Sequence, residues 1–235
     1  MVSEWKQKRF WKQVGVLPED DGFCIALDGP QVKTPAKSAL RVPTAAMARA
    51  IAAEWDAQEE TVKPLTMPFT RTANAAIDKV AHQHGEVADM LAAYGDSDLL
   101  CYRAETPDAL VRRQRQNWDP VLDWGEQALG VRLVPRAGVI HRSQDGSANA
   151  RLSDQVHALS HFQLAAFHDL VTLTGSLILG FATARGWRGA DEIWSLSRLD
   201  ETWQEEQWGV DEEAREMAEI KRRAFLHAKQ FFDLS

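Results

Sequence analysis

The first part of the chain alternates apolar and polar residues in a way typical of short β-strands. Three extended runs lie between Gly22 and Pro43, at residues 23–27, 31–34 and 40–42. Asp28-Gly29 separates the first two, and this pair between apolar runs indicates a hairpin, because the turn requires positive φ. Pro30 and Pro35 offer no N–H to a ladder, so we expect the strands to be short or to lie at edges.

A helix is predicted directly after these strands. Thr44 is a suitable N-cap for an alanine-rich helix over residues 45–56. Met47, Ile51 and Trp55 stand four residues apart and form one apolar stripe. We expect this stripe to pack against the sheet. An extended segment should follow at 61–68, because its two prolines restrict the residues that precede them.

Beyond Phe69 the pattern is almost entirely helical. The predicted helices cover 70–83, 86–102, 107–129 with a break at Asp119-Pro120, 153–185 with an interruption near Gly175, 191–208 and 212–232. Short extended pieces are expected at 131–134 and 138–141. The fold class is therefore α+β and mainly helical. A small N-terminal α/β unit with a short antiparallel sheet, residues 1–80, precedes a larger helical bundle, residues 81–235, with the boundary between Pro68 and Gly85.

The predicted helix over 191–208 carries two apolar faces. Trp194, Glu201 and Trp208 are seven residues apart and drift by only about 40° around the helix, so they form one line. The opposite face is also apolar, with Ile193, Leu196, Leu199 and Trp203. A helix with two apolar faces either buries both or buries one and offers the other to a partner.

Composition narrows the classes of function. The net charge of −7 argues against a general nucleic-acid binder, whose affinity comes largely from Lys and Arg. The chain has only two cysteines, Cys24 and Cys101, without CxxC spacing, which fits a reducing compartment. The first ten residues lack the apolar core of a signal peptide. Leu170 to Ala184 falls short of the ~20 apolar residues of a membrane span, so we expect a cytoplasmic protein without membrane insertion.

Common catalytic motifs are missing from the sequence. It has no GxxxxGK[ST], GxGxxG after a strand, HExxH or GxSxG. Carboxylates remain candidates for acid–base chemistry: Asp96 and Asp98 near a predicted bend, and Glu201 between its tryptophans, where apolar rings can raise a carboxyl pKa. The alternative function is thus an enzyme that uses Asp98 or Glu201 in a cleft between the two units.

Histidines on the predicted helix 153–185 form the candidate metal site. His157, His161 and His168 fall with Asp154 within about 60° of the helix wheel, and His at i and i+4 can share one ion. The simpler interpretation is a polar helix face opposite Val156, Leu159 and Ala166, so no metal is predicted and His157 and His161 are kept only as candidates.

The line of Trp194, Glu201 and Trp208 fits recognition, because aromatic residues around a charge are typical of binding hot spots. Core or interdomain packing, with Glu201 paired to an arginine, explains the same residues, and residue types alone leave both interpretations open.

Several short stretches, taken together, resemble the ATP12 family of F1 ATP synthase assembly chaperones, in its α-proteobacterial form. They span residues 9 to 225 and comprise Arg9-Phe-Trp-Lys12, Leu27-Asp-Gly29 with Lys33-Thr-Pro35, Glu54-Trp-Asp-Ala-Gln58, Thr66-Met-Pro68, and Ser197-Arg-Leu-Asp-Glu201 with Trp208-Gly209.

The resemblance implies a non-enzymatic protein without a cofactor that binds the free α subunit of F1 and shields the surface later covered by the β subunit. It implies an α/β N-terminal part and an orthogonal helical bundle, a monomer when free, and a bacterial cytoplasmic location, with eukaryotic relatives in the mitochondrial matrix. Two positions, Glu201 and Trp55, match residues important to the family. The departures lie at 205–206 and 211–213, which are more acidic here. The predicted partner-binding residues are Glu201, Trp194, Trp208, Asp200, Gln204, Glu205 and Trp55.

Overall fold

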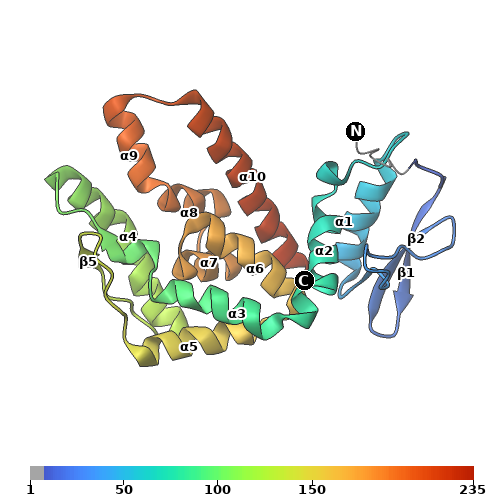
Figure 1. Ribbon diagram of the computed structural model, residues 1–235, viewed down its shortest axis with the longest axis horizontal. Helices are drawn as coiled ribbons and strands as arrows, with labels where there is room; N and C mark the ends of the chain where they lie inside the picture. The colour runs from blue at the N-terminus through green and yellow to red at the C-terminus, as the bar shows by residue number, and fades with distance from the viewer. Residues whose placement is uncertain (1–7) are drawn as a thin grey trace, which may run out of the picture.

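The computed structural model describes residues 8–235, which form a small unit containing a sheet and a larger helical part (Figure 1). The sheet is antiparallel, in the order β1 (Val14–Glu19), β2 (Gly22–Leu27), β3 (Arg41–Val42). In the register of the first pair, Val14 lies opposite Leu27 and Glu19 opposite Gly22. The predicted α+β, mainly helical fold class is confirmed.

The predicted turn at Asp28-Gly29 is present, with φ of 53° and 116°. The run that follows it makes two isolated bridges, Gln31 with Ala26 and Lys33 with Ala39, instead of a full strand. Pro30 supplies no N–H, and its carbonyl accepts a hydrogen bond from the Leu27 N–H at 2.9 Å. The longest pairing of the sheet is instead between β2 and β1, a strand that the sequence analysis did not predict.

Two helices accompany the sheet, α1 (Ala45–Asp56) and α2 (Pro68–Asp78). The Thr44 hydroxyl caps α1 by accepting the Met47 N–H at 3.1 Å, as predicted. Met47 and Ile51 are fully buried and belong to one hydrophobic cluster with residues of β2 and β3. The expected packing of this stripe on the sheet is confirmed, and it fixes α1 to one face of the sheet.

The remaining chain is mostly helical. The helices are α3 (His84–Ala92), α4 (Asp108–Leu129), α5 (Gly146–His157), α6 (His161–Thr174), α7 (Leu177–Ala184), α8 (Ala190–Ser197), α9 (Leu199–Trp208) and α10 (Glu212–Leu234). Short 3-10 turns occur at 64–66, 80–82, 93–95 and 99–101. Two short strands, β4 (Tyr102–Arg103) and β5 (Arg136–Ala137), pair in parallel beside α4.

Several of the predicted helix boundaries are wrong. The segment 153–185 is split at Ser160 as well as near Gly175, because Ser160 begins α6 with a capping box in which it and Gln163 satisfy each other's backbone N–H groups. The break expected at Asp119-Pro120 is absent, since α4 continues through Pro120. Trp118 and Val121 are fully buried there, and their packing outweighs the lost hydrogen bond.

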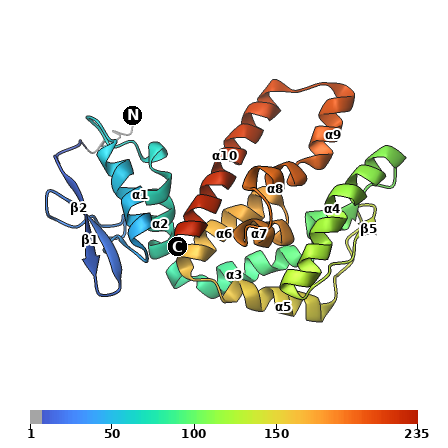
Figure 2. The same cartoon turned by 180° about the vertical axis from the view of Figure 1, so that it is seen from behind.

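Two hydrophobic clusters form the core, and α6 and α10 contribute to both. Most of α6 lies in the cluster of the helical part, whereas Phe162 at its start belongs to the cluster beneath the sheet. Similarly, Phe225 of α10 packs in the helical part and Phe231 near its end in the sheet unit. Figure 2 shows α10 running from its junction with α9 to the neighbourhood of α2. The division into residues 1–80 and 81–235 stays a prediction.

Among the described residues, no helix combines the length and the apolar character needed to cross a membrane. The expectation about a signal peptide falls largely on residues 1–7, which lie outside the described part of the chain.

Candidate partner-binding site

The helix expected over 191–208 is two helices, α8 and α9, and the break lies at Arg198. The backbone there has φ −101° and ψ 13°, so Arg198 ends α8 and begins α9. The predicted single line through Trp194, Glu201 and Trp208 is therefore interrupted. Only the second helix carries the exposed part of that line.

Trp194 lies in the core. Its side chain is 6% exposed, and its ring packs on Phe225 of α10 with centroids 5.6 Å apart. The Trp118 indole of α4 donates to the Leu196 carbonyl at 2.8 Å, and Ser197 Oγ donates to the Trp194 carbonyl at 2.7 Å. These contacts hold α8 against α4 and α10. The ring of Trp194 is thus part of the core that supports the beginning of α9.

One side of α9 is attached to α4. Gln114 Nε2 donates to Asp200 Oδ1 at 2.8 Å, and Arg113 Nη2 donates to Glu206 Oε1 at 2.9 Å. The Arg113 guanidinium also lies 5.8 Å from the centre of the Trp203 ring. The hydrogen bond from Arg113 holds the pKa of Glu206 below its ordinary value. Asp200, one of the residues predicted to bind the partner, is therefore engaged in anchoring α9 to α4.

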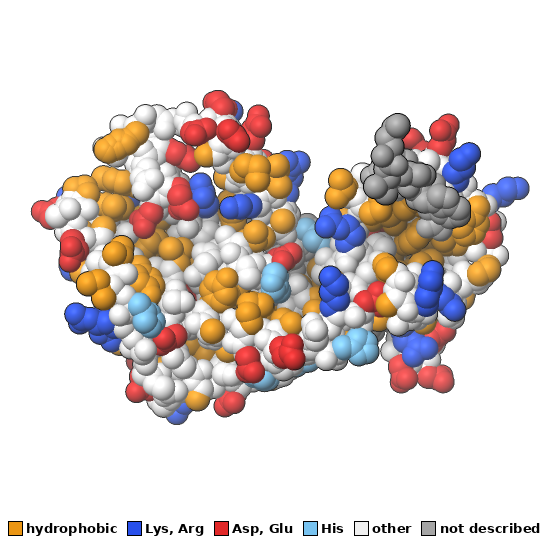
Figure 3. Space-filling model, in the orientation of Figure 1, with side chains coloured by type: hydrophobic (Ala, Val, Ile, Leu, Met, Phe, Trp, Pro, Cys, Tyr) orange, Lys and Arg blue, Asp and Glu red, His pale blue; other side chains and the backbone are white. Residues whose placement is uncertain are grey.

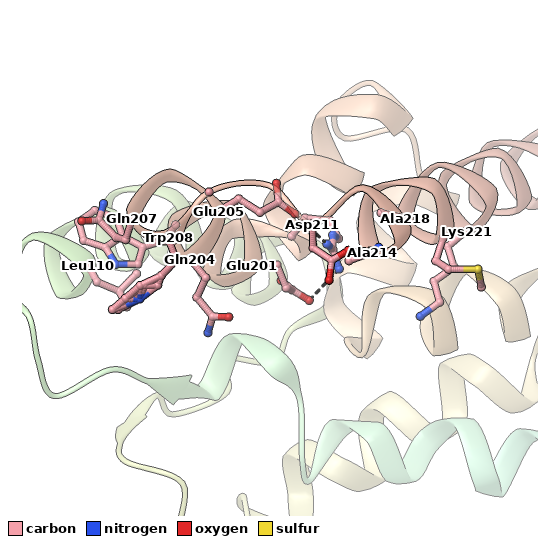
Figure 4. Close-up of a pocket in the computed structure, with 14 residues that line it drawn as sticks. Leu110, Glu201, Gln204, Glu205, Gln207, Trp208, Asp211, Ala214, Ala218 and Lys221 are labelled. Atoms are coloured by element: carbon pink, nitrogen blue, oxygen red, sulfur yellow. Dashed lines mark hydrogen bonds and ion pairs between the residues drawn. The ribbon is translucent and has the colours of Figure 1, made fainter.

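The free side of α9 faces a groove of about 710 Å³ that the beginning of α10 closes on its other side (Figure 4). Four predicted binding residues line this groove: Glu201, Gln204, Glu205 and Trp208. Arg198 Nη1 donates to Glu201 Oε1 at 3.0 Å, and Arg198 Nη2 lies 3.8 Å from Glu205 Oε1. Because the Glu201 side chain stays 48% exposed, this ion pair leaves a carboxylate available at the surface.

The groove ends in an exposed apolar corner. Trp208 is 74% exposed, and Val210 is 53% exposed in the loop that joins the two helices. Gly209, with φ of 93°, turns the chain there, and the Asp211 carboxylate caps α10 by accepting the N–H groups of Glu213 and Ala214. The loop and the first turns of α10 thus form an arch that stands away from the helical core (Figure 1).

The α10 side of the groove was missed by the sequence analysis. Ala214, Met217, Ala218 and Lys221 line it from α10, and Leu110 lines it from α4. The four α10 residues stand at i, i+3, i+4 and i+7, which is the spacing of one helix face. That periodicity can be read in the sequence, but it does not show whether the face is covered by another element. In the structure this face is partly exposed, with Met217 at 49% exposure.

Comparison with known proteins decides the family. The family model described as ATP12 chaperone protein matches residues 8–126. Protein atp12, mitochondrial, of Schizosaccharomyces pombe is 30% identical over 222 residues, covering 89% of this chain and 76% of that protein. The chain belongs to the ATP12 chaperone family.

Solved structures of ATP12 proteins share the whole fold. The crystal structure of Atp12 from Paracoccus denitrificans is 48% identical and superposes with a TM-score of 0.95, over 98% of this chain and 99% of that one. A point mutant of the same Paracoccus denitrificans protein gives 47% identity and a TM-score of 0.96, over 99% of both chains. The predicted resemblance to the ATP12 family is confirmed.

The remaining binding residue carried over from the ATP12 family lies elsewhere in the molecule. Trp55 is half-buried on α1, in the unit that holds the sheet, and its ring meets that of Trp11 edge-on at 5.3 Å. Trp55 does not line the groove between α9 and α10. Trp55 and Glu201, the two positions that match residues important to the family, therefore lie in different parts of the molecule.

Asp98 is a structural carboxylate in this ATP12 protein. It is fully buried, and its two oxygens accept the N–H groups of Leu100 at 3.0 Å and Ile178 at 3.1 Å, at the beginnings of two helical segments. Burial raises its pKa to about 6. Neither Asp98 nor Glu201 lines the groove between the sheet unit and the helical part.

The candidate metal residues are also not brought together. Ser160 starts a new helix between His157 and His161, which removes the i and i+4 relation. His157 Nε2 lies 2.8 Å from Asp89 Oδ1, whereas burial, and then the neighbouring His84, lower the pKa of His161. Within residues 8–235, no group of three His, Cys, Asp or Glu side chains is placed to hold a metal ion.

Proposed function

We propose that this chain binds the free α subunit of F1 ATP synthase through the groove between α9 and α10 and shields the β-facing surface until assembly. As a member of the ATP12 family it is an F1 ATP synthase assembly chaperone. The observation that carries the proposal is the exposed apolar corner formed by Trp208, Val210 and Met217 beside the Glu201 carboxylate.

Such a corner is suited to a protein partner. Large apolar side chains cluster at binding surfaces of soluble proteins, and tryptophan is the residue type most enriched in hot spots. Glu201 and Glu205 supply charge beside the apolar surface, and charges at the edge of an interface give orientation and specificity. We therefore expect an apolar segment with basic neighbours to occupy the groove.

The construction of the arch fits a reversible complex. One face of α9 is attached to α4, and Leu199 is the only buried residue of this helix in the described chain. An element with few buried contacts adapts to a partner but adds an ordering cost to binding. This predicts the modest affinity that permits release when the β subunit competes for the same surface.

We further propose that the protein acts without catalysis, is a monomer when free, and resides in the bacterial cytoplasm. The identity of nearly half its residues with the Paracoccus denitrificans protein supports the bacterial assignment. Cys24 and Cys101 are both buried and unbonded, which is compatible with a reducing compartment.

Gel filtration of the chain with purified α subunit tests the function. We expect the two proteins to elute together and the chain to suppress aggregation of α. Trp208→Ala combined with Met217→Ala should abolish both effects. Val139→Ala with Ile140→Ala, at residues 89% and 79% exposed in another loop, is the matched control and should leave them intact. Separate elution of wild-type chain and α subunit would contradict the proposal.

A further inference from the structure

A second groove lies where the helical part meets the sheet unit. Its volume is about 1150 Å³, and it is lined by residues of α2, α6 and α10 and by the segment that leads into α3. Figure 3 shows the molecule hollowed between these two parts, with basic and histidine side chains gathered along the hollow. The volume exceeds that of typical small-molecule pockets and suits a polypeptide segment.

The charge of this second groove is opposite to that of the molecule as a whole. The chain carries a net charge of −7, yet Arg71, Lys79 and Arg223 line the groove against a single carboxylate, Asp169. Asp169 Oδ1 lies 2.9 Å from His168 Nδ1, and Arg223 Nε lies 3.8 Å from Glu219 Oε1. Arg71 and Lys79 are exposed and form no ion pair with another residue in the range 8–235. The local positive charge is therefore available to an anionic partner.

The rest of the lining is apolar. Leu65 and Ile220 are 83% and 52% exposed, and Ala165 and Ala224 also line the groove. His227 is held among aromatic rings, 4.6 Å from the centre of Phe69, and its Nε2 lies 3.3 Å from Thr72 Oγ1. An apolar surface with a basic edge is complementary to an apolar segment with acidic neighbours.

The two grooves share α10. Met217, Ala218 and Lys221 line the groove on the α9 side, whereas Ile220, Ala224 and His227 line the second groove. At 100° per residue these two triplets are centred on adjacent faces of one helix. A partner that closes around α10 therefore reaches both grooves at once. Three carboxylates and two cations line the first groove, whereas one carboxylate and three Lys or Arg side chains line the second.

We propose that the second groove binds a segment of the partner that has an apolar centre and acidic neighbours. The α9–α10 groove binds another segment of the same partner, one with basic neighbours. This inference rests on the proposed function, since it takes the partner to be the α subunit. Contact at two surfaces of opposite charge orients the partner on the chaperone, because the reversed orientation places like charges together at both.

The test measures how reversing the charge of the second groove changes the affinity for purified α subunit. Arg71→Glu with Lys79→Glu should weaken binding by about ten-fold or more and reduce its dependence on salt. Lys33→Glu with Arg49→Glu, at exposed positions of the sheet unit, changes the net charge equally and should leave the affinity unchanged. Circular dichroism melts establish that each variant is folded, and Arg71→Gln with Lys79→Gln should give an intermediate loss.

Four results distinguish the two proposals. Loss of affinity only in the Arg71 and Lys79 variants supports the second groove. Equal affinity of wild type and the reversed variant overturns the second groove and leaves the proposed function standing. Failure of the wild-type chain to bind α overturns both. Equal loss in the control variant shows a general charge effect and also overturns the second groove.

Discussion

We propose that Glu201 contacts a partner and does not hold the fold. Its side chain is 48% exposed, and its ion pair with Arg198 is of the kind worth at most about 1 kcal/mol. We predict that Glu201→Gln leaves the melting temperature within about 3 °C of wild type but weakens binding of the α subunit about ten-fold. Glu86→Gln, an exposed carboxylate on α3, is the control. A large loss of stability with Glu201→Gln would mean that this carboxylate supports the fold.

The two tryptophans of the predicted line should behave oppositely. Trp194 is 6% exposed and Trp208 is 74% exposed. Replacing a buried tryptophan by alanine typically costs about 3–5 kcal/mol of unfolding free energy, whereas exposed positions usually change it by less than about 0.5 kcal/mol. Urea unfolding of Trp194→Ala and Trp208→Ala measures this difference. Equal, small losses would contradict the burial of Trp194.

Asp98 should make stability depend on pH in a defined direction. The pKa of its buried carboxyl is raised from 3.8 to about 6, so the folded state binds the proton more tightly than the unfolded state. This contribution, about 3 kcal/mol, is fully present below pH 3.8 and is lost as the pH rises through about 6. The carboxylates with lowered pKa have the opposite effect at more acidic pH.

Urea unfolding of wild type and Asp98→Asn between pH 4 and 7 isolates this carboxyl. The difference in unfolding free energy between the two proteins should change across that window in favour of the variant as the pH rises. A difference that stays constant from pH 4 to 7 would show that Asp98 does not titrate there.

Residue patterns predicted local backbone features more accurately than they predicted which side chains are exposed. The Asp28-Gly29 pair gave the turn, and its positive φ values are present. Glu201 and Trp208 were found as surface candidates because their types suit recognition. The burial of Trp194 was not predictable from the heptad spacing, since it depends on Phe225 of a helix about thirty residues further along the chain.

At the scale of elements, α9 is an arm attached to α4 by a few side chains. We predict that Arg113→Ala, which removes the bonds to Glu206, speeds hydrogen exchange in residues 199–208. Global unfolding should change little, because these contacts lie outside the core. Arg112→Ala, an exposed neighbour on the same helix, is the control. Unchanged exchange in the Arg113 variant would show that other contacts hold α9.

Element boundaries were predicted where a local signal exists. The Thr44 cap and the helix over 45–56 agree with α1. The strand β1 was missed because Gly15 and Pro18 interrupt its apolar pattern, and its pairing with β2 is a non-local property. The break at Arg198 was missed because no Gly or Pro marks it. There, the packing of α8 against α4 and α10 fixes the end of the helix.

For the whole molecule, the sequence predicted the mainly helical α+β class and the family, because both follow from features spread along the chain. It did not predict the grooves, one between α9 and the beginning of α10 and the other where α10 meets the sheet unit. A groove forms where neighbouring helices leave a surface uncovered. Helical periodicity indicates only which face of a helix is apolar, so it does not show where such a surface remains.

Hydrogen exchange of the chain, alone and with stoichiometric α subunit, tests the central claim most directly, because it maps the covered surface without altering a residue. We predict that peptides spanning residues 199–221 exchange several-fold more slowly in the complex, while peptides from β1 and β2 keep their rates. If the complex forms and residues 199–221 exchange at the rate of the free protein, the groove between α9 and α10 is not the binding site.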